Sequence, residues 1–141
     1  MNWRTIFLLS LFGLAMGVAT VFFIGSNVEP GLWLLIFLFC AWVIARQTSG
    51  RRFLHGVLLG LANSVWITAA HIVFFQQYLS THAREAEMMK STPLSDSPRL
   101  MMAITGPVVG LVSGVVIGLL ALVAGKFVKP AAAGRAVSGG A

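Results

Sequence analysis

The chain has 141 residues, of which 57% are hydrophobic and only 10% are charged, and its formal net charge is +6. Ordinary soluble domains carry about 25% charged residues, so this composition excludes a typical soluble domain and indicates a membrane protein. The positive charge does not indicate nucleic-acid binding, because the basic residues lie at the ends of apolar segments without interleaved aromatic residues. A single cysteine, Cys40, excludes an internal disulfide.

The first two predicted spans cover about residues 5–25 and 30–47. The first has an apolar run of about 20 residues, which is too long for the apolar core of a cleaved signal peptide and enough to cross a bilayer. Its small residues Gly13 and Gly17 lie on one helical face and predict contact with another helix. The second span is rich in aromatic residues, which favours contact with lipid.

The third predicted span, about residues 53–79, is the most polar. A hydrogen-bonding side chain at bilayer depth is unfavourable unless it finds a partner, so we expect the polar band of this helix to face protein. The band and its border contain two glycines and four candidate polar intramembrane residues: Gly56, Gly60, Asn63, Ser64, Thr68 and His71. The outer segment 80–99 follows, and we expect the helix to continue through Lys90 and to end before Pro93.

The fourth predicted span, about residues 100–126, carries a glycine at every fourth position. Repeated GxxxG spacing of this kind, a glycine zipper, lets a second helix backbone approach closely inside a bilayer. We therefore expect a packing surface that meets the other helices or a second copy of the chain. Its residues are Gly106, Gly110, Gly114 and Gly118.

The positive charges predict the orientation. One face of the predicted membrane region carries seven basic residues, and the other carries three, Arg84, Lys90 and Arg99; the seven are Arg4, Arg46, Arg51, Arg52, Lys126, Lys129 and Arg135. Cytoplasmic loops are enriched in Lys and Arg, so both termini are predicted to be cytoplasmic in a bacterial inner membrane. The fold class is thus an all-α, multi-pass bundle of four transmembrane helices in one domain, residues 1–129, followed by a low-complexity tail, 130–141.

Candidate chemistry is sparse. His71, an ionisable residue deep in a span, is either a proton relay or a neutral interface histidine bonded to a hydroxyl or carbonyl group. His82 and Glu85 form an i, i+3 pair that could supply two metal ligands, although a solvated helix face explains them equally simply. No nucleophile lies beside an identifiable base, and the interiors of the spans lack Asp, Glu, Lys and Arg, so we predict neither enzyme activity nor a cofactor.

The second half of the chain resembles a known family. The order of motifs from Ser49 to the end of the fourth span is similar to that of small bacterial four-span membrane proteins catalogued as a domain of unknown function. The motifs are Gly50-Arg51-Arg52-Phe53, Gly56, Gly60, Met88-Met89, Gly106-Pro107, Gly110, Gly114 and Gly118. The resemblance implies the four-span topology and supplies no activity and no site residues.

Three functions follow as hypotheses. The first is a non-catalytic membrane protein that acts by helix association, as a homo-oligomer or as an accessory subunit of a membrane complex. The second is a small passive channel or carrier with a polar path along the third helix, lined by Asn63, Ser64, Thr68 and His71. The third is a protein that binds a lipid or pigment between its helices.

Overall fold

A computed structural model describes residues 1–128, which contain helices and no strands. Four of the helices are, by length and composition, long and apolar enough to cross a membrane, which confirms the predicted all-α class and the four candidate spans. The predicted tail, 130–141, lies outside the described residues. The helices are α1 (Trp3–Phe22), α2 (Glu29–Gln47), α3 (Arg52–Val73), α4 (Phe75–Thr81), α5 (Ala83–Lys90) and α6 (Pro98–Phe127).

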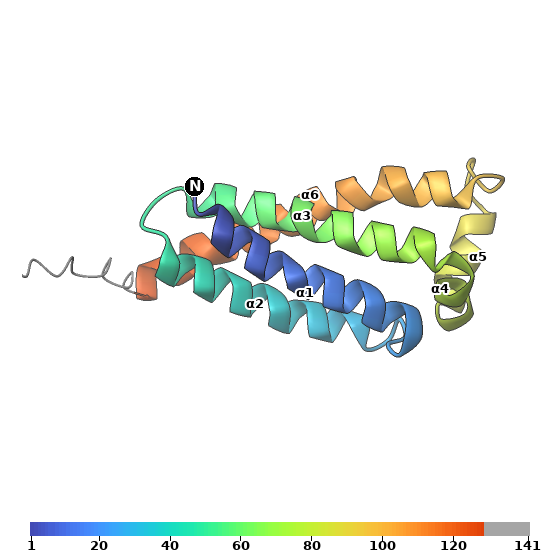
Figure 1. The fold of residues 1–141 in the computed structure, drawn as a ribbon, viewed down its shortest axis with the longest axis horizontal. Coiled ribbons are helices and arrows are strands. Elements are labelled where there is room, and N and C mark those ends of the chain that lie inside the picture. The colour runs from blue at the N-terminus through green and yellow to red at the C-terminus, as the bar shows by residue number, and fades with distance from the viewer. Residues whose placement is uncertain (129–141) are drawn as a thin grey trace, which may run out of the picture.

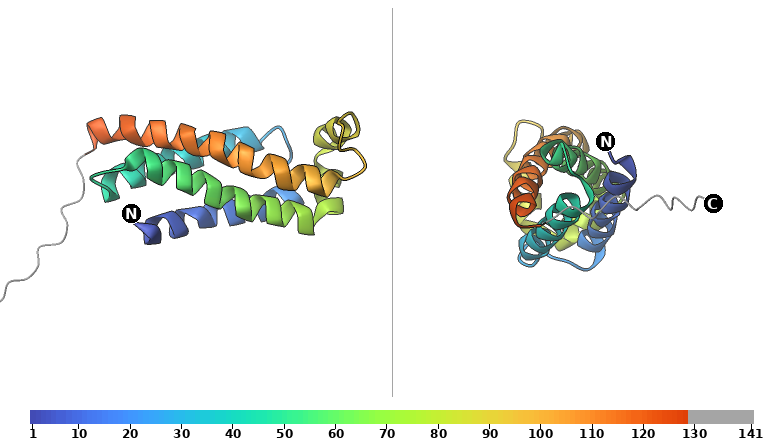
Figure 2. Two further views of the ribbon diagram at one scale, coloured as in Figure 1. Left: turned by 90° about the horizontal axis from the view of Figure 1, so that it is seen from above. Right: turned by 90° about the vertical axis from the view of Figure 1, so that its left-hand side faces the viewer.

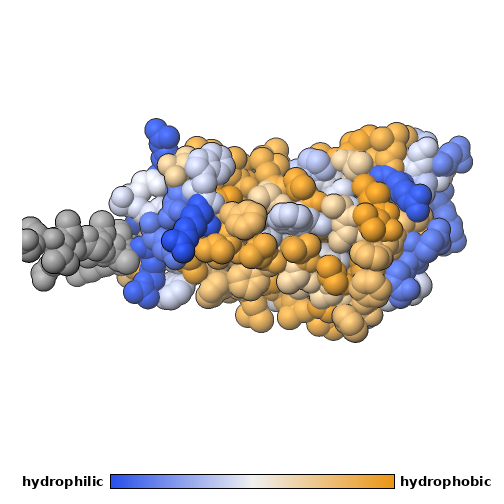
Figure 3. All heavy atoms as spheres, viewed as in Figure 1, coloured by the Kyte–Doolittle hydropathy of each residue, from blue (hydrophilic) through white to orange (hydrophobic). Residues whose placement is uncertain are grey.

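The four long helices lie side by side, and the short helices α4 and α5 lie together at one end of them (Figure 1). Helix α3 packs against α1 and α6, and α6 packs against α2, as the two turned views also show (Figure 2). The start of α1, the end of α2, the start of α3 and the end of α6 form the opposite end, here called the amino-terminal end. Hydrophilic residues gather at both ends, with an apolar band between them (Figure 3).

The third predicted span is not one continuous helix. The backbone leaves helical geometry at Phe74, with φ −101° and ψ 37°, so α3 ends at Val73 and α4 begins at Phe75. A second interruption at His82, with φ −126° and ψ 63°, separates α4 from α5. The expected helix through residues 53–79 and on to Lys90 is therefore wrong at these two points. Helix α4 contacts the end of α1, where the hydroxyl of Thr81 lies 3.3 Å from the carbonyl oxygens of Thr20 and Val21.

Glycines bring α3 and α6 into backbone contact. A Cβ atom at Gly60 would collide with the backbone of Gly110 and Gly114, and one at Gly56 would collide with that of Gly118. Gly106 faces the side chain of Thr68 on α3 in the same way. Because these contacts lie within one chain, the glycine stripe of α6 is covered by α3.

The glycines of α1 lie against α3. A Cβ atom at Gly13 would lie 2.7 Å from the Cα atom of Asn63, and one at Gly17 would lie 3.1 Å from that of Ile67. Helix α3 therefore stands between α1 and α6 and contacts small residues on both.

Two apolar clusters lie toward opposite ends of the long helices. The larger cluster joins α2 and α6 toward the amino-terminal end and consists of Leu9, Cys40, Ala41, Ile44, Leu59, Ile117 and Ala121. The smaller one, at the α4–α5 end, consists of Val21, Phe75, Tyr78 and Met102. Apolar burial of this kind holds α2 to α6 mainly through the second half of each helix.

Candidate ligand-binding cavity

A cavity of about 640 Å³ lies between α2, α3 and α6, in the half of the molecule nearer α4 and α5. Its lining includes Leu34 of α2 and Val109 of α6, which are 57% and 62% exposed, so the cavity reaches the surface between these two helices. Toward the amino-terminal end, the larger apolar cluster closes the gap between α2 and α6. The volume lies in the range of about 300–1,000 Å³ that is typical of small-molecule sites.

Small residues line the cavity on α3 and α6. Gly60, Ser64 and Thr68 follow one face of α3 at a spacing of four residues, and Gly106 and Gly110 face them from α6. These residues hold the two helices close together and add little side-chain volume. The result is one wall made of backbone and short polar side chains, while larger apolar residues of α2 line the other side.

All four predicted polar intramembrane residues, Asn63, Ser64, Thr68 and His71, line this cavity. The hydroxyl of Ser64 donates to the carbonyl of Leu61 in its own helix at 2.8 Å, so that side chain is already satisfied. The sequence thus indicated the polar wall of the cavity. It predicted a polar path along the third helix, whereas the structure shows a cavity that opens between α2 and α6.

Asn63 is the unusual member of this group. Its side chain is 4% exposed, and among residues 1–128 neither its amide nitrogen nor its amide oxygen has a hydrogen-bond partner. An unpaired buried polar group costs about 1–3 kcal/mol, so such a group needs a compensating interaction or a function. Its residue borders the cavity, but both amide atoms are buried and Oδ1 lies against α1, 2.7 Å from the position of a Cβ atom at Gly13, so the amide is directed away from the cavity.

His71 is bonded to another helix. Its Nε2 atom lies 2.9 Å from the hydroxyl oxygen of Thr20 on α1, and that hydroxyl also lies 2.8 Å from the carbonyl oxygen of Met16. Because a threonine hydroxyl has one hydrogen, which it donates to Met16, His71 donates its Nε2–H to Thr20. A bond to a hydroxyl on another helix is the interface contact that the sequence offered as the alternative to a proton relay.

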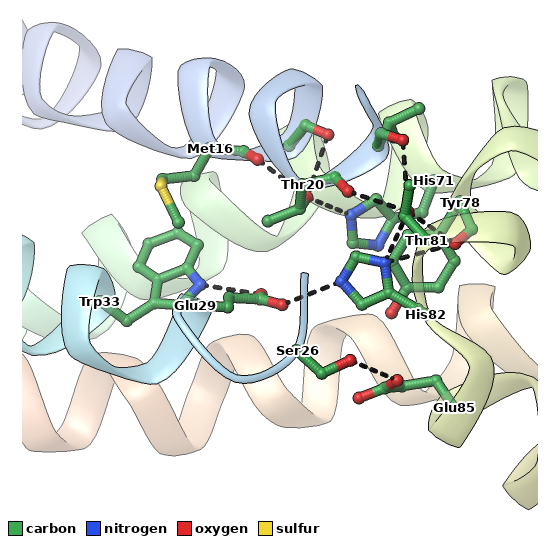
Figure 4. A network of polar contacts seen from close by, with 12 residues as sticks. Met16, Thr20, Ser26, Glu29, Trp33, His71, Tyr78, Thr81, His82 and Glu85 are labelled. Atoms are coloured by element: carbon green, nitrogen blue, oxygen red, sulfur yellow. Dashed lines mark hydrogen bonds and ion pairs between the residues drawn. The ribbon is translucent and has the colours of Figure 1, made fainter. Parts of the chain in front are cut away.

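Three aromatic rings stack at the α4–α5 end of the cavity (Figure 4). The ring of Tyr78 lies between those of His71 and His82, with centroid distances of 4.0 Å and 4.3 Å and interplanar angles of 24° and 20°. Burial, and secondarily the carboxylates of Glu29 and Glu85, raise the pKa of the Tyr78 phenol, so it stays protonated. The interruption at Phe74 allows this stack, because in a straight helix His71 and Tyr78 would lie about 10.5 Å apart along the axis.

Glu29, at the start of α2, meets the end of the stack. Its Oε2 atom lies 3.3 Å from Nε2 of the fully buried His82, and its Oε1 atom accepts a hydrogen bond of 3.1 Å from the indole nitrogen of Trp33 (Figure 4). Both Glu29 and Trp33 line the cavity. The sequence did not mark Glu29, Trp33 or Tyr78 as site residues. The signal for Glu29 and Trp33 is the i, i+4 spacing of an acid and an indole at the start of a span.

The predicted metal pair is not brought together. His82 points to Glu29, whereas Glu85 accepts a hydrogen bond of 2.8 Å from the hydroxyl of Ser26. Within residues 1–128, no group of three or more His, Cys, Asp and Glu residues is placed to hold a metal ion. The alternative explanation, a solvated helix face, is also wrong for His82, which is buried because the chain turns at this residue.

These observations define a class of site: an amphipathic cavity among three of the candidate membrane spans, with a polar wall, aromatic residues and one carboxylate. Comparisons with known protein families, curated proteins and solved structures find no match for the chain. The chemistry of the cavity is therefore the basis for assigning a function. Hydrogen bonds from the polar wall and apolar contacts from α2 are suited to binding a molecule that has both a polar and an apolar part.

Proposed function

We propose that the chain is an integral membrane protein that binds an amphipathic small molecule in the cavity between α2, α3 and α6. It acts as a non-catalytic binding protein or passive carrier. One observation supports this most directly: a cavity of about 640 Å³, with a wall of short polar side chains on α3 and apolar residues on α2, reaches the surface between two candidate spans. A bound molecule with a polar and an apolar part could contact both sides of this cavity.

The proposed setting is a bundle of four transmembrane helices in a bacterial inner membrane, with both termini cytoplasmic. Arg4, Arg46, Arg51 and Lys126 belong to the amino-terminal end, while Arg84, Lys90 and Arg99 belong to the α4–α5 end. The excess of basic residues at the amino-terminal end supports a cytoplasmic position for that end. The cavity then lies in the outer half of the bilayer.

Helix association with a second copy or with another membrane protein remains a prediction. The glycine stripe on α6 is covered by α3 of the same chain, so association would require a different surface. Replacing Gly110 or Gly114 by leucine would disturb the contact between α3 and α6 within one chain, so these variants would not test association between chains. The cavity, in contrast, is present in one chain.

Binding is tested on purified full-length protein in lipid nanodiscs. Molecules that copurify after gentle solubilisation are identified by mass spectrometry, and a set of fluorescent amphipathic probes that are cationic, neutral and anionic is titrated against loaded and empty discs. The variant Ser113→Phe places a large side chain on the cavity wall. Its matched control is Val112→Phe at the adjacent position, which is 61% exposed and does not line the cavity.

We expect saturable binding of at least one probe to the parent and to Val112→Phe, with a loss of binding in Ser113→Phe. The absence of saturable binding for every probe, together with no copurified molecule, would refute the proposal. Equal binding by the two phenylalanine variants would also contradict it, because the probe would then occupy another part of the surface.

A further inference from the structure

The charges around the cavity are unequal. Its lining contains one carboxylate, Glu29, and neither Lys nor Arg. The other lining residues are uncharged at pH 7 with His71 in its neutral form, and the described contacts of that ring are with a hydroxyl and an aromatic ring, not with a carboxylate. The net charge of the +6 chain is therefore opposite in sign to the charge at this site.

Among residues 1–128, neither Lys nor Arg pairs with Glu29, and its two partners are Trp33 and His82. Trp33 contributes a neutral N–H donor at 3.1 Å. Because a carboxylate only accepts hydrogen bonds, the Nε2 atom of His82, 3.3 Å away, carries the hydrogen that lies toward Glu29. A carboxylate has about four acceptor positions, and these two donors leave part of that capacity unused.

Aromatic and sulfur-containing side chains surround the carboxylate. Trp33, Phe37 and Tyr78 line the same cavity, together with Met89 and Met102. The faces of aromatic rings attract cations, and this attraction is strongest where water is excluded. Methionine side chains are apolar and adapt to irregular shapes. A small, strongly hydrated metal ion would gain little from such a lining, whereas a cation with an apolar body would contact all of it.

We infer that the ligand of this cavity is an organic cation with an apolar body, whose charged group is recognised by Glu29 and the ring of Trp33. The inference rests on the proposed function, since it specifies the chemical class of the molecule that the cavity binds. Apolar contact retains the body of the ligand, and the single carboxylate selects its charge.

The inference is tested with ions of one shape and opposite charge. Tetraphenylphosphonium and tetraphenylborate differ in the sign of their charge, and triphenylphosphine oxide serves as a neutral analogue. Each is titrated against the full-length protein in nanodiscs, and its partitioning into empty nanodiscs is subtracted. We expect tetraphenylphosphonium to bind at least about tenfold more tightly than the other two, since one desolvated cation–aromatic contact supplies a difference of that order.

Two variants separate charge from general packing. Glu29→Gln keeps the size of the side chain and an acceptor for Trp33, and we expect it to weaken tetraphenylphosphonium binding about tenfold while binding of the neutral analogue is unchanged. Its control is Glu87→Gln, which removes an exposed carboxylate paired only with Lys90 and outside the cavity. If Glu29→Gln misfolds, Trp33→Leu provides a second test, because it removes an aromatic face and leaves the charge in place.

The outcomes distinguish the inference from the proposed function. Similar affinities for the three molecules, or a loss in Glu87→Gln as large as that in Glu29→Gln, would overturn the inference and leave a cavity that binds amphipathic molecules without charge selection. Tighter binding of the anion would also overturn it. Failure of every molecule to bind above the level of empty nanodiscs would count against the proposed function as well.

Discussion

The contact between α3 and α6 is tested most directly by adding a single methyl group at Gly60. In Gly60→Ala the new Cβ atom would meet the Cα and nitrogen atoms of Gly114 and the carbonyl oxygen of Gly110. All three are backbone atoms, so no side chain can rotate away and the helices must move apart. A separation of about 0.5–1 Å forfeits about a quarter to a half of the dispersion attraction between facing atoms. Overpacking of this kind costs about 1–3 kcal/mol.

A matched substitution provides the control. Gly31, in the first turn of α2, has no atom within 4 Å of the position that a Cβ atom would occupy. Gly31→Ala should therefore be neutral or stabilise by up to about 1 kcal/mol, because alanine favours helix over glycine. Unfolding of both variants and the parent in mixed detergent micelles, followed by far-UV circular dichroism, gives the free energies. If the free energy of unfolding of Gly60→Ala equals that of Gly31→Ala, the backbones of α3 and α6 are not in close contact at Gly60.

Three further predictions use the same protein preparation or intact cells. Asn63→Leu preserves the branched shape and removes the unpaired amide, so unfolding should require about 1–3 kcal/mol more; lower stability would show that the amide is satisfied. Thr20→Val removes the hydroxyl bonded to the histidine of α3 and should destabilise by up to about 2 kcal/mol; an unchanged free energy would contradict that bond. With Cys40→Ala as background, a membrane-impermeant maleimide should label Ser95→Cys in spheroplasts and Ser49→Cys only after disruption, and the reverse pattern would invert the proposed orientation.

The local part of the architecture could be predicted from the sequence. Apolar length gave the four candidate spans, and the helical period placed Asn63, Ser64, Thr68 and His71 along one side of α3. The spacing of glycines indicated where backbones could approach, although it did not show whether the partner belonged to the same chain. Periodicity describes the faces of one helix and says nothing about which other helix will cover them.

The rest depends on contacts between distant residues. Neither glycine nor proline marks the interruption at Phe74, so nothing in the local sequence indicated that α3 would end there. The pairing of Glu29 with His82 joins residues that are 53 positions apart, and it forms only because the chain turns at both ends of α4. A cavity is a property of how helices diverge, and it has no signature in the sequence of any one of them.

The position of the cavity opening has a consequence for how any ligand would arrive. The opening lies between α2 and α6. Its rims are formed by Leu34 and Val109, which are exposed apolar residues of the two helices. In a bilayer these rims would face acyl chains, so a ligand would enter sideways from the leaflet in which it is already dissolved. Occupancy would then follow the ratio of ligand to lipid and not the aqueous concentration, and diluting the vesicles with buffer would barely empty the site.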